Sequence, residues 1–324
     1  MGETMSKKQA LPRPARPIRT DLVIRPACAE DRTALEAIAA QIWDGEDYLP
    51  RVFDVWLADP QGRFFVAELH GQVIGAAKIS RLAEGEWWLQ GLRVDPAFQG
   101  QGIGRALHHF LTNQVRQHGA GEVRFSTASV NVAVHRLAAE TGFRRELVCV
   151  LLHAAALGAP PHGWRVLPRE ALPRVWAWLQ RSARFEQACR SLEWNWTFYR
   201  ITQPLLSERL AAGLVYGWLP EGAKALGGVV VLNPAQPSDD APPALKIGYL
   251  DVPDATLTEA ARDIRRLAGA LGRARVRIKP PKTKLAALEK AGFLREWDAE
   301  VWLYARDVVL TRHADVLNET APET

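Results

Sequence analysis

The sequence predicts an α/β protein in which one folding unit is used twice. Its 324 residues are about twice the length of an average domain, and 48% hydrophobic with 24% charged residues is typical of a globular chain. Segments with the pattern of strands are interspersed with segments of helical periodicity. In each half a strand ends at Val94-Asp95-Pro96 or Asp251-Val252-Pro253, and helix, strand, helix and a Gly-Phe pair follow. The alternative is that these short matches arise by chance.

The first half is predicted to begin with a strand at 22–25 and a helix at 29–42. Apolar segments at 64–69 and 73–79 flank His70-Gly71-Gln72, which predicts a β-hairpin. The other elements predicted in this half are a strand at 87–94, an amphipathic helix from residue 103, a strand at 121–126, a helix at 131–141 and strands between 143 and 157.

A linker is predicted at 158–163, where two prolines and two glycines lie close together. Beyond it, Thr256 and Glu259 have the spacing of a capping box at the start of a helix that Gly272 would end. The other elements predicted here are helices at 170–189, 203–213 and 282–291, strands at 224–232, 244–252 and 274–279, and strands up to Asp307.

The net charge of +5 and the isoelectric point near 9.2 come from two short segments. Residues 1–20 carry +4 and are rich in proline, which predicts a flexible basic arm. Residues 273–284 hold six basic and no acidic residues, and the rest of the chain has a net charge of −5. Every second residue from Arg273 to Lys279 is basic, which predicts one charged strand face. We favour a solvated face over a nucleic-acid or acidic partner, because aromatic residues for base stacking are absent.

Several classes of protein are not predicted. No apolar segment is long enough to span a membrane, and the N-terminal residues lack the apolar region of a secretory signal. The three cysteines, Cys28, Cys149 and Cys189, are odd in number and lack the spacing of metal ligands. The sequence therefore predicts a cytoplasmic protein with free thiols and no metal.

The most informative segment is Leu92–Arg105, in which Gly100, Gly102 and Gly104 alternate at the junction of a strand and a helix. Glycine lets the backbone approach a ligand closely, and a helix start presents N–H groups and partial positive charge. The combination predicts a pyrophosphate-binding loop. It is not a P-loop, which ends in Gly-Lys-Ser/Thr, and Arg105 stands where a Rossmann loop needs its third glycine. The alternative is a glycine-rich turn that only shortens the corner.

On these residues the chain resembles the GNAT acetyltransferase superfamily. Gln99, Gly102 and Gly104 match the family's pyrophosphate signature, Gln/Arg-x-x-Gly-x-Gly/Ala, and Val66–Gly75 is similar to its central hairpin. The resemblance covers residues 22–157 and is only topological in the second half. It implies an α/β (α+β) fold of two GNAT-like domains, each with a mixed, mainly antiparallel twisted sheet flanked by helices.

The resemblance implies acetyl-CoA as co-substrate and direct acetyl transfer to a primary amine. The backbone of Leu92 and Val94 would pair with the pantetheine arm, and the Leu92 N–H would polarise the thioester carbonyl. Asn131, which precedes a helix ending at Gly142-Phe143, would contact the cofactor or act only as the N-cap. The loop residues that would hold the pyrophosphate are Gln99, Gly100, Gln101, Gly102, Ile103, Gly104 and Arg105.

Acetyl transfer also needs a group that takes a proton from the attacking amine and one that protonates the leaving thiolate. Strand alternation places Glu86 on the face of Leu92, and a solvated strand end is its alternative role. Asp47 is the second candidate carboxylate. The family's tyrosine acid is replaced here by Ala138, so the acid would be water or another residue, for instance Tyr48.

The acceptor site is predicted beside residues 42–50, which form one wall of that site in GNAT proteins. Acidic residues there would attract a cationic amine and aromatic residues would pack on its carbon body, with an exposed acidic loop as the alternative. Trp88 and Gln90 are further candidates, and core packing is the alternative for Trp88. The candidates within the segment are Trp43, Asp44, Glu46, Asp47 and Tyr48.

The second half lacks the glycine loop, and Asp251 and Asp254 there would repel a pyrophosphate. It is therefore predicted to have lost acetyl-CoA binding. Its densest aromatic group, at 194–199, is predicted to be core, pocket wall or interface. The predicted regions are an arm (1–20), an acetyltransferase domain (21–157), a linker (158–163), a degenerate second domain (164–307) and a tail (308–324).

The predicted function is acetyl-CoA-dependent N-acetylation of a primary amine, such as a small molecule or an amino acid. The alternatives are acetylation of a protein lysine or N-terminus, a non-catalytic acyl-CoA-binding regulator, and nucleic-acid binding, which is disfavoured. The predicted partner is a small-molecule amine, without a membrane, and a homodimer is left open.

Overall fold

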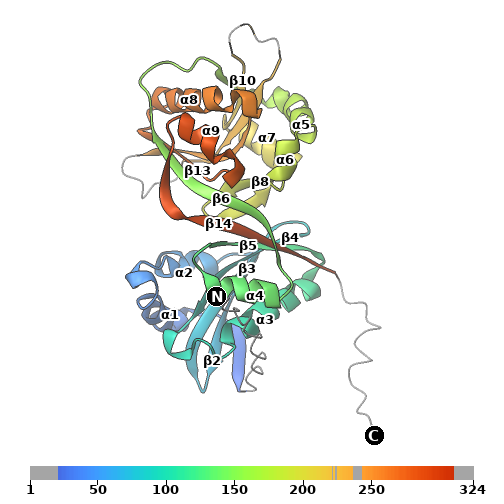
Figure 1. Ribbon diagram of the computed structural model, residues 1–324. Helices are drawn as coiled ribbons and strands as arrows, with labels where there is room; N and C mark the ends of the chain where they lie inside the picture. Colours follow the sequence, from blue (N-terminus) through green and yellow to red (C-terminus); the bar gives the residue numbers. More distant parts are fainter. Residues whose placement is uncertain (1–20, 221, 223–224, 236–242, 310–324) are drawn as a thin grey trace, which may run out of the picture. The chain divides into compact units, whose positions relative to one another are not determined.

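The computed structural model describes most of the chain (Figure 1). The predicted N-terminal arm and nearly all of the predicted C-terminal tail lie outside the described residues. The structure describes residues 21–309, apart from 221, 223–224 and 236–242.

The chain forms two compact units. Among the described residues, unit 1 comprises 21–80 and 91–114, and unit 2 comprises those of 81–90 and 115–309. This division follows compactness rather than the two predicted halves, so the domain boundary predicted at 158–163 stays a prediction.

Unit 1 alternates strands and helices along the chain: β1 (Leu22–Pro26), α1 (Arg32–Ala39), α2 (Leu49–Leu57), β2 (Gly62–Leu69), β3 (Gln72–Ala83), β4 (Glu86–Val94) and α3 (Ile103–His118). Within it the strand order is β1-β2-β3-β4, and β2 is antiparallel to both β1 and β3. His70 and Gly71 have φ values of 51° and 79°, which is the geometry of a tight two-residue hairpin turn. The predicted hairpin is thus confirmed.

Helices cover both faces of the unit 1 strands. Phe64 and Phe65 are consecutive residues of β2 and therefore point to opposite faces. The ring of Phe64 contacts Phe53 of α2 at a centroid distance of 5.8 Å, and the ring of Phe65 contacts Phe110 of α3 at 4.9 Å. The middle of β2 is consequently buried on both sides.

Unit 2 contains the beginning of β4, within 81–90, and the described residues from 115 onward. Its strand order is β4-β5-β14-β6-β13-β12-β11-β10-β7, with β8 and β9 as a separate hairpin. Only the pairs β4/β5 and β12/β13 are parallel among the described strand pairs. Its elements are β5 (Gly121–Ala128), α4 (Val132–Glu140), β6 (Arg144–Ala155), β7 (Trp164–Val166), α5 (Leu172–Gln180), α6 (Ala183–Gln187), β8 (Ser191–Trp194), β9 (Thr197–Arg200), α7 (Gln203–Ala211), β10 (Val215–Trp218), β11 (Gly228–Leu232), β12 (Ala244–Asp251), α8 (Asp254–Ala270), β13 (Arg275–Ile278), the 3-10 helix η5 (Lys282–Lys284), α9 (Leu285–Lys290) and β14 (Leu294–Val308).

The last strand of the second half lies among strands of the first half. β14 pairs with β5 from Val301↔Ala128 to Val308↔Gly121 and pairs on its other side with β6. β6 in turn pairs with β13, and Figure 1 shows β6 and β14 running side by side. The predicted class, a mixed and mainly antiparallel sheet flanked by helices, is confirmed, and the two halves share one sheet in unit 2.

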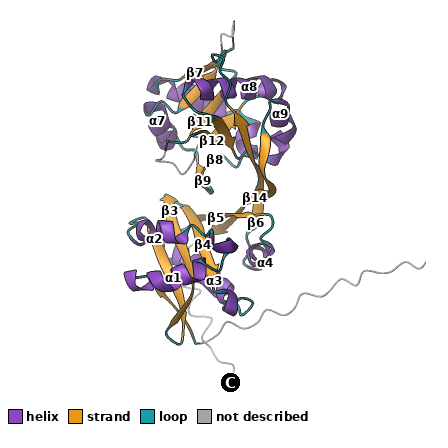
Figure 2. Cartoon of the chain, turned by 90° about the vertical axis from the view of Figure 1, so that its left-hand side faces the viewer, coloured by secondary structure: helices purple, strands orange, loops and turns teal. Residues whose placement is uncertain are grey.

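In unit 2, β11 is also covered on both faces. Val229 and Val231 of β11 belong to a core with α5, α6 and α7, whereas Val230 and Leu232 belong to a core with α8 and α9. Figure 2 shows α7 and α9 on opposite sides of β11 and β12. This double burial explains why β11 is a continuous apolar run rather than an alternating pattern.

The predicted helix at 29–42 is shorter, and a second helix follows it. α1 ends at Ala39, and the positive φ values of Trp43 (51°) and Asp44 (55°) cannot continue a helix. α2 was not predicted; it begins at Leu49 and has Pro50 in its first turn, where proline is favourable.

The capping box predicted at Thr256 and Glu259 is wrong. α8 begins three residues earlier, at Asp254, with Pro253 instead of Thr256 at the N-cap position. The Thr256 hydroxyl donates to the Pro253 carbonyl at 3.3 Å instead of capping a later start. The end predicted at Gly272 is confirmed by its φ of 67°. The strands β7 to β10, of three or four residues each, were not predicted.

Glu86 is buried in unit 2 and is not a solvated strand end. Its carboxylate pairs with Arg124 of β5, and Oε1 also accepts from the Arg200 N–H at 2.9 Å. Arg124 is fully buried and also donates to the Ser191 hydroxyl and to the Phe198 carbonyl, both at 2.8 Å. This cluster joins β4 and β5 to the β8–β9 hairpin.

The basic segment 273–284 is not a free cationic face. Arg277 pairs with Glu296 and Lys279 with Glu193, each at 2.5 Å. Two more pairs at 2.5 and 2.6 Å join Lys282 to Glu300 and Lys284 to Asp254. Because acids distant in sequence balance these cations, the segment does not favour a nucleic-acid site.

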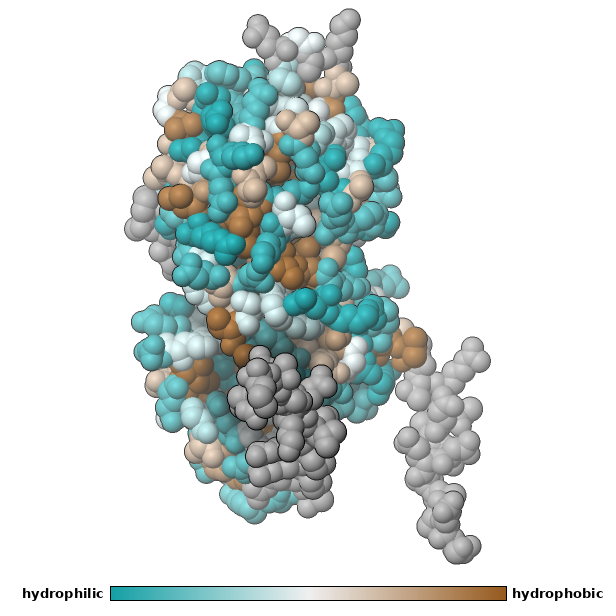
Figure 3. Space-filling model, viewed as in Figure 1, coloured by the Kyte–Doolittle hydropathy of each residue, from teal (hydrophilic) through white to brown (hydrophobic). Residues whose placement is uncertain are grey.

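The molecular face in Figure 3 is mainly hydrophilic, and hydrophobic residues lie in small groups between polar ones. Within the described part of the chain, no helix is both long and apolar enough to cross a membrane. Cys28, Cys149 and Cys189 are free thiols, as predicted.

Replacing Glu86 by alanine is expected to lower the free energy of unfolding by about 3 kcal/mol, because Arg124 would stay buried with one carboxylate fewer. Urea denaturation followed by circular dichroism measures this change. Glu84→Ala is the matched control, since Glu84 is exposed, and should change the free energy of unfolding by less than about 0.5 kcal/mol. Equal losses in the two variants would contradict the role given to Glu86.

Candidate functional site

The candidate site lies in unit 1, where β4 leads into α3. Gly91 interrupts β4 with a φ of 69°, and a side chain there would overlap the ring of Trp56. A left-handed residue within a strand ends the regular alternation of side chains. The prediction that Glu86 and Leu92 share one strand face therefore fails at Gly91.

The alternating glycines have the local structure that the sequence predicts. Gly100 and Gly102 have φ values of 73° and 86°, in the left-handed region that glycine adopts without strain. The Gly102 carbonyl accepts the N–H of Ala106 at 2.9 Å and so starts α3, a helix of 16 residues. Successive N–H groups in such a turn form a concave site for an anion at the positive end of the helix dipole.

The surroundings of this loop fit a diphosphate. A Cβ on Gly100 would have no atom within 4 Å, so the loop is open there, and a Cβ on Gly102 would lie 3.7 Å from Nη2 of Arg105. The Arg105 cation is thus beside the loop. A Cβ on Gly104 would lie 3.7 Å from Val94 and 4.0 Å from Leu92, so the helix start packs directly against the end of β4.

Side chains of the loop fix its own backbone. Asp95 accepts the N–H of Ala97 at 2.9 Å, and its own N–H donates to the Ile74 carbonyl of β3 at 2.8 Å. The Gln99 amide donates to the Val94 carbonyl at 3.2 Å, and the Gln101 amide donates to the Ala97 carbonyl at 3.4 Å. These side chains shape the loop, and their contact with a cofactor stays a prediction.

A buried ion pair connects β4 to the segment 42–50. The Arg93 side chain pairs with Asp47, with Nη2 at 3.0 Å from Oδ1, and Arg93 Nη1 donates to the Leu92 carbonyl at 3.0 Å. Asp47 Oδ1 also accepts the N–H of Leu49 at the start of α2. Burial opposes the charge of Arg93, but the bond to Asp47 raises the pKa of its guanidinium. Asp47 thus holds the segment in place. It is buried, whereas the sequence predicts that it lies in an acidic wall that faces the amine or solvent.

The aromatic residues of the segment surround Arg93. Its guanidinium lies 4.5 Å from the ring centroid of Trp43 and 5.1 Å from that of Tyr48. Trp43 is 57% exposed, whereas Tyr48 also packs edge-on against Trp56 at 5.8 Å. Burial raises the pKa of the Tyr48 hydroxyl, although Arg93 opposes this, so the hydroxyl stays protonated.

Asp44 and Glu46 are exposed, as an acidic wall for an amine requires. Asp44 is held at a φ of 55° within a turn in which Gly45 donates to the Ile42 carbonyl at 3.0 Å. The turn therefore presents two carboxylates and the Trp43 ring to solvent. Together these groups suit the recognition of a cation.

Three further predicted site residues, Trp88, Gln90 and Asn131, lie in unit 2. Trp88 is 3% exposed and packs on Phe198 at a centroid distance of 6.4 Å, so it is core and not a substrate contact. Gln90 is half-buried and directly precedes Gly91. Asn131 is the N-cap of α4, since its Oδ1 accepts the Val134 N–H at 3.4 Å.

The α4 position where the family has a tyrosine is closed. Ala138 is fully buried, and α4 meets a tyrosine from β14 instead: the Tyr304 hydroxyl lies 3.0 Å from Nδ1 of His135. No sequence pattern indicates this contact, because it depends on the position of β14 in the sheet.

Arg93 is the residue that sequence analysis missed. Its side chain and Asp47 are 46 residues apart in the chain. Two signals were available in the sequence: Arg93 is the one basic residue of 86–94, and the segment 42–50 is acidic and lacks basic residues.

Comparison with known proteins agrees with this geometry. The acetyltransferase (GNAT) family matches residues 31–143. N-alpha-acetyltransferase RimI of Mycobacterium tuberculosis is 35% identical over 112 residues, which are 33% of this chain and 69% of that protein. The chain belongs to the GNAT acetyltransferase family.

Other similarities are partial or concern the fold alone. Histidine N-acetyltransferase of Oreochromis niloticus is 34% identical over 91 residues, which are 28% of this chain and only 27% of that protein. A tandem GNAT protein from the clavulanic acid biosynthesis pathway aligns over 90% of this chain and 100% of its own, with 16% identity and a TM-score of 0.54. This last match shows a shared fold.

Gly100→Ala is expected to weaken the binding of acetyl-CoA at least about tenfold in titration calorimetry, because the new methyl group would occupy the open side of the loop. Gly71→Ala is the matched control: Gly71 also has a positive φ and open surroundings, but it lies in the hairpin. Both variants should lose about 1 kcal/mol of stability through backbone strain. Equal acetyl-CoA affinities in the two variants would place the cofactor elsewhere.

Proposed function

We propose that this protein is an acetyl-CoA-dependent N-acetyltransferase that acts on the primary amine of a small molecule or amino acid. The observation that carries the proposal is the left-handed glycine pair at Gly100 and Gly102, at the start of α3 and beside Arg105. Family membership and the acceptors in the relatives' names, histidine and an N-alpha amine, support amine acetylation.

Acetyl-CoA supplies the acetyl group as an activated thioester. The N–H groups of the loop and the dipole of α3 would bind its diphosphate. The side chains of Leu92 and Val94 pack near Gly104, and the backbone of these two residues would align the pantetheine with β4. The Leu92 N–H would polarise the thioester carbonyl. Arg93 bonds the Leu92 carbonyl and so fixes this peptide segment.

The acceptor amine would be bound at the turn 43–46. Asp44 and Glu46 would attract the ammonium group and the exposed face of Trp43 would contact its carbon body. Glu86 and Asp47 are poor bases because arginine side chains already occupy both carboxylates. Asp44 and Glu46 would therefore accept the proton of the ammonium, directly or through water.

Tyr48 would protonate the departing thiolate. Tyr48→Phe keeps the ring that contacts Arg93 and Trp56, so it is expected to lower kcat by about 100-fold while leaving the Kd of acetyl-CoA unchanged. Because the pKa of Tyr48 is raised above its ordinary value of 10, activity should not fall between pH about 7 and about 9.5. A fall in that range, or full activity of the variant, would contradict this role.

The second candidate function is an acyl-CoA-binding regulator without turnover, and the buried Ala138 in place of the tyrosine favours it. Thiol release from acetyl-CoA, measured across amino acids, polyamines and peptide N-termini, separates the two functions. We expect saturable release with at least one amine and none in Gly102→Glu, which would place a carboxylate in the loop. Tight acetyl-CoA binding without release on any amine would support the regulator instead.

A further inference from the structure

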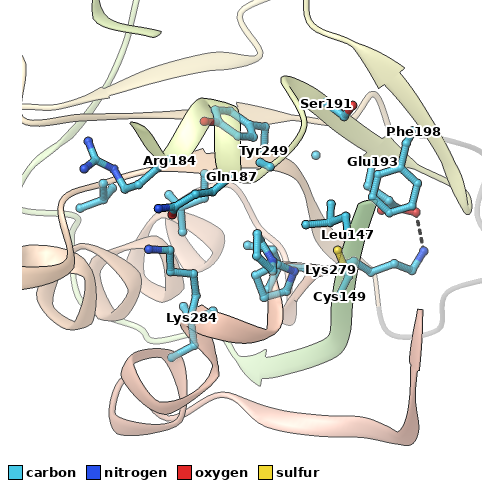
Figure 4. Close-up of a pocket in the computed structure, with 18 of the residues that line it drawn as sticks. Leu147, Cys149, Arg184, Gln187, Ser191, Glu193, Phe198, Tyr249, Lys279 and Lys284 are labelled. Carbon is cyan, nitrogen blue, oxygen red and sulfur yellow. Dashed lines mark hydrogen bonds and ion pairs between the residues drawn. The ribbon is translucent and has the colours of Figure 1, made fainter. Parts of the chain in front are cut away.

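A cavity lies in unit 2. Its volume is about 630 Å³, including the open mouth. Figure 4 shows its side chains converging from several elements of the second half and from β6. None of the glycine-loop residues from Gln99 to Arg105 lines it.

The cavity begins where two parallel strands separate. The β12/β13 ladder ends at Ile247↔Ile278, and the cavity is lined by the residues that follow on each side, from Gly248 and from Lys279. Gly248 leaves no room for a side chain on that side, since a Cβ there would lie 2.6 Å from Oδ1 of Asn233. The backbone of β12 therefore approaches Asn233 closely where the cavity begins.

One end of the cavity offers hydrogen-bond donors. Arg184 binds Asp251 through Nε at 2.9 Å, and within the described part of the chain its two Nη groups have no further partner. Gln187 lies one turn away on α6 and has its amide in the cavity lining. Lys284 lies on the same side, where it pairs with Asp254 at 2.6 Å (Figure 4).

The rest of the lining is mainly apolar. The body of the cavity is formed by side chains of β12, α8, β13 and α9, and Glu193 is already paired with Lys279 at 2.5 Å toward the opposite side (Figure 4). The aliphatic residues that line it include Leu250, Val252, Leu257, Ile278 and Leu288.

We propose that this cavity binds an apolar monocarboxylate, with its carboxylate on Arg184, Gln187 and Lys284 and its hydrocarbon chain along the aliphatic wall. A planar guanidinium with two open N–H groups matches the two oxygens of a carboxylate. The charges of Asp251 and Asp254, which the sequence suggested would repel an anion, are balanced by Arg184 and Lys284.

The strand-to-helix junction of the second half differs from the glycine loop at 99–105. The strand-to-helix junction of the second half runs through Val252 and Pro253 directly into α8, with Asp254 in its first turn. No glycine nest is present at this junction, so a diphosphate has no backbone cradle. The ligand is therefore a carboxylate that binds independently of acetyl-CoA.

The proposal is tested by titrating the full-length protein with straight-chain carboxylates from butanoate to octanoate in a calorimeter. The affinity is expected to rise about fourfold per methylene group, as burial of hydrocarbon requires, and octanol should bind at least about tenfold more weakly than octanoate. Saturating acetyl-CoA should leave octanoate binding unchanged.

Arg184→Lys keeps the charge that Asp251 needs but loses the fork, and should weaken octanoate binding at least about tenfold with an unchanged unfolding transition. Gln187→Leu, which removes no bond within the described structure, should also weaken it. Glu208→Gln, an exposed substitution on α7, is the control and should bind as the wild type does. Equal affinity for octanol, displacement by acetyl-CoA, wild-type binding in Arg184→Lys, or no binding of any chain length would overturn the proposal.

Discussion

The ion pair between Arg93 and Asp47 connects the two parts of the candidate site. One partner lies at the end of β4, beside the peptide of Leu92, and the other lies before α2 in the turn that presents Asp44 and Glu46. Removing one partner of a buried pair leaves an uncompensated charge and costs about 3–5 kcal/mol. The pair therefore fixes the acceptor turn relative to the strand on which the thioester would be polarised.

Close backbone approach makes this arrangement possible. Gly75 lets β3 approach β4, because a Cβ there would lie 2.7 Å from the Arg93 carbonyl, and Gly91 makes room for the ring of Trp56. The following glycine loop then turns the chain into α3. In unit 2, the exchange of β14 into the strands of the first half has a comparable role, since it joins both halves in one sheet.

Features set by neighbouring residues could be predicted from the sequence, and features set by distant partners could not. The hairpin at His70-Gly71 and the glycine loop depend on local backbone conformation, which composition reveals. The partners of Arg93 and Glu86 lie 46 and 38 residues away, and both carboxylates had been considered as catalytic groups. Likewise, both β6 and β14 have the pattern of a strand. Neither pattern indicates that β14 pairs with β5 or that β6 pairs with β13.

We infer that the Arg93–Asp47 pair positions the amine and not the cofactor. A double-mutant cycle of Asp47→Asn and Arg93→Met, with the KM of the accepted amine and the Kd of acetyl-CoA as readouts, tests it most directly. We expect that each single variant raises the amine KM at least about tenfold, that the double variant is no worse than either, and that the acetyl-CoA Kd changes less than about twofold. Additive effects of the two substitutions, or equal losses of amine and acetyl-CoA binding, would contradict it.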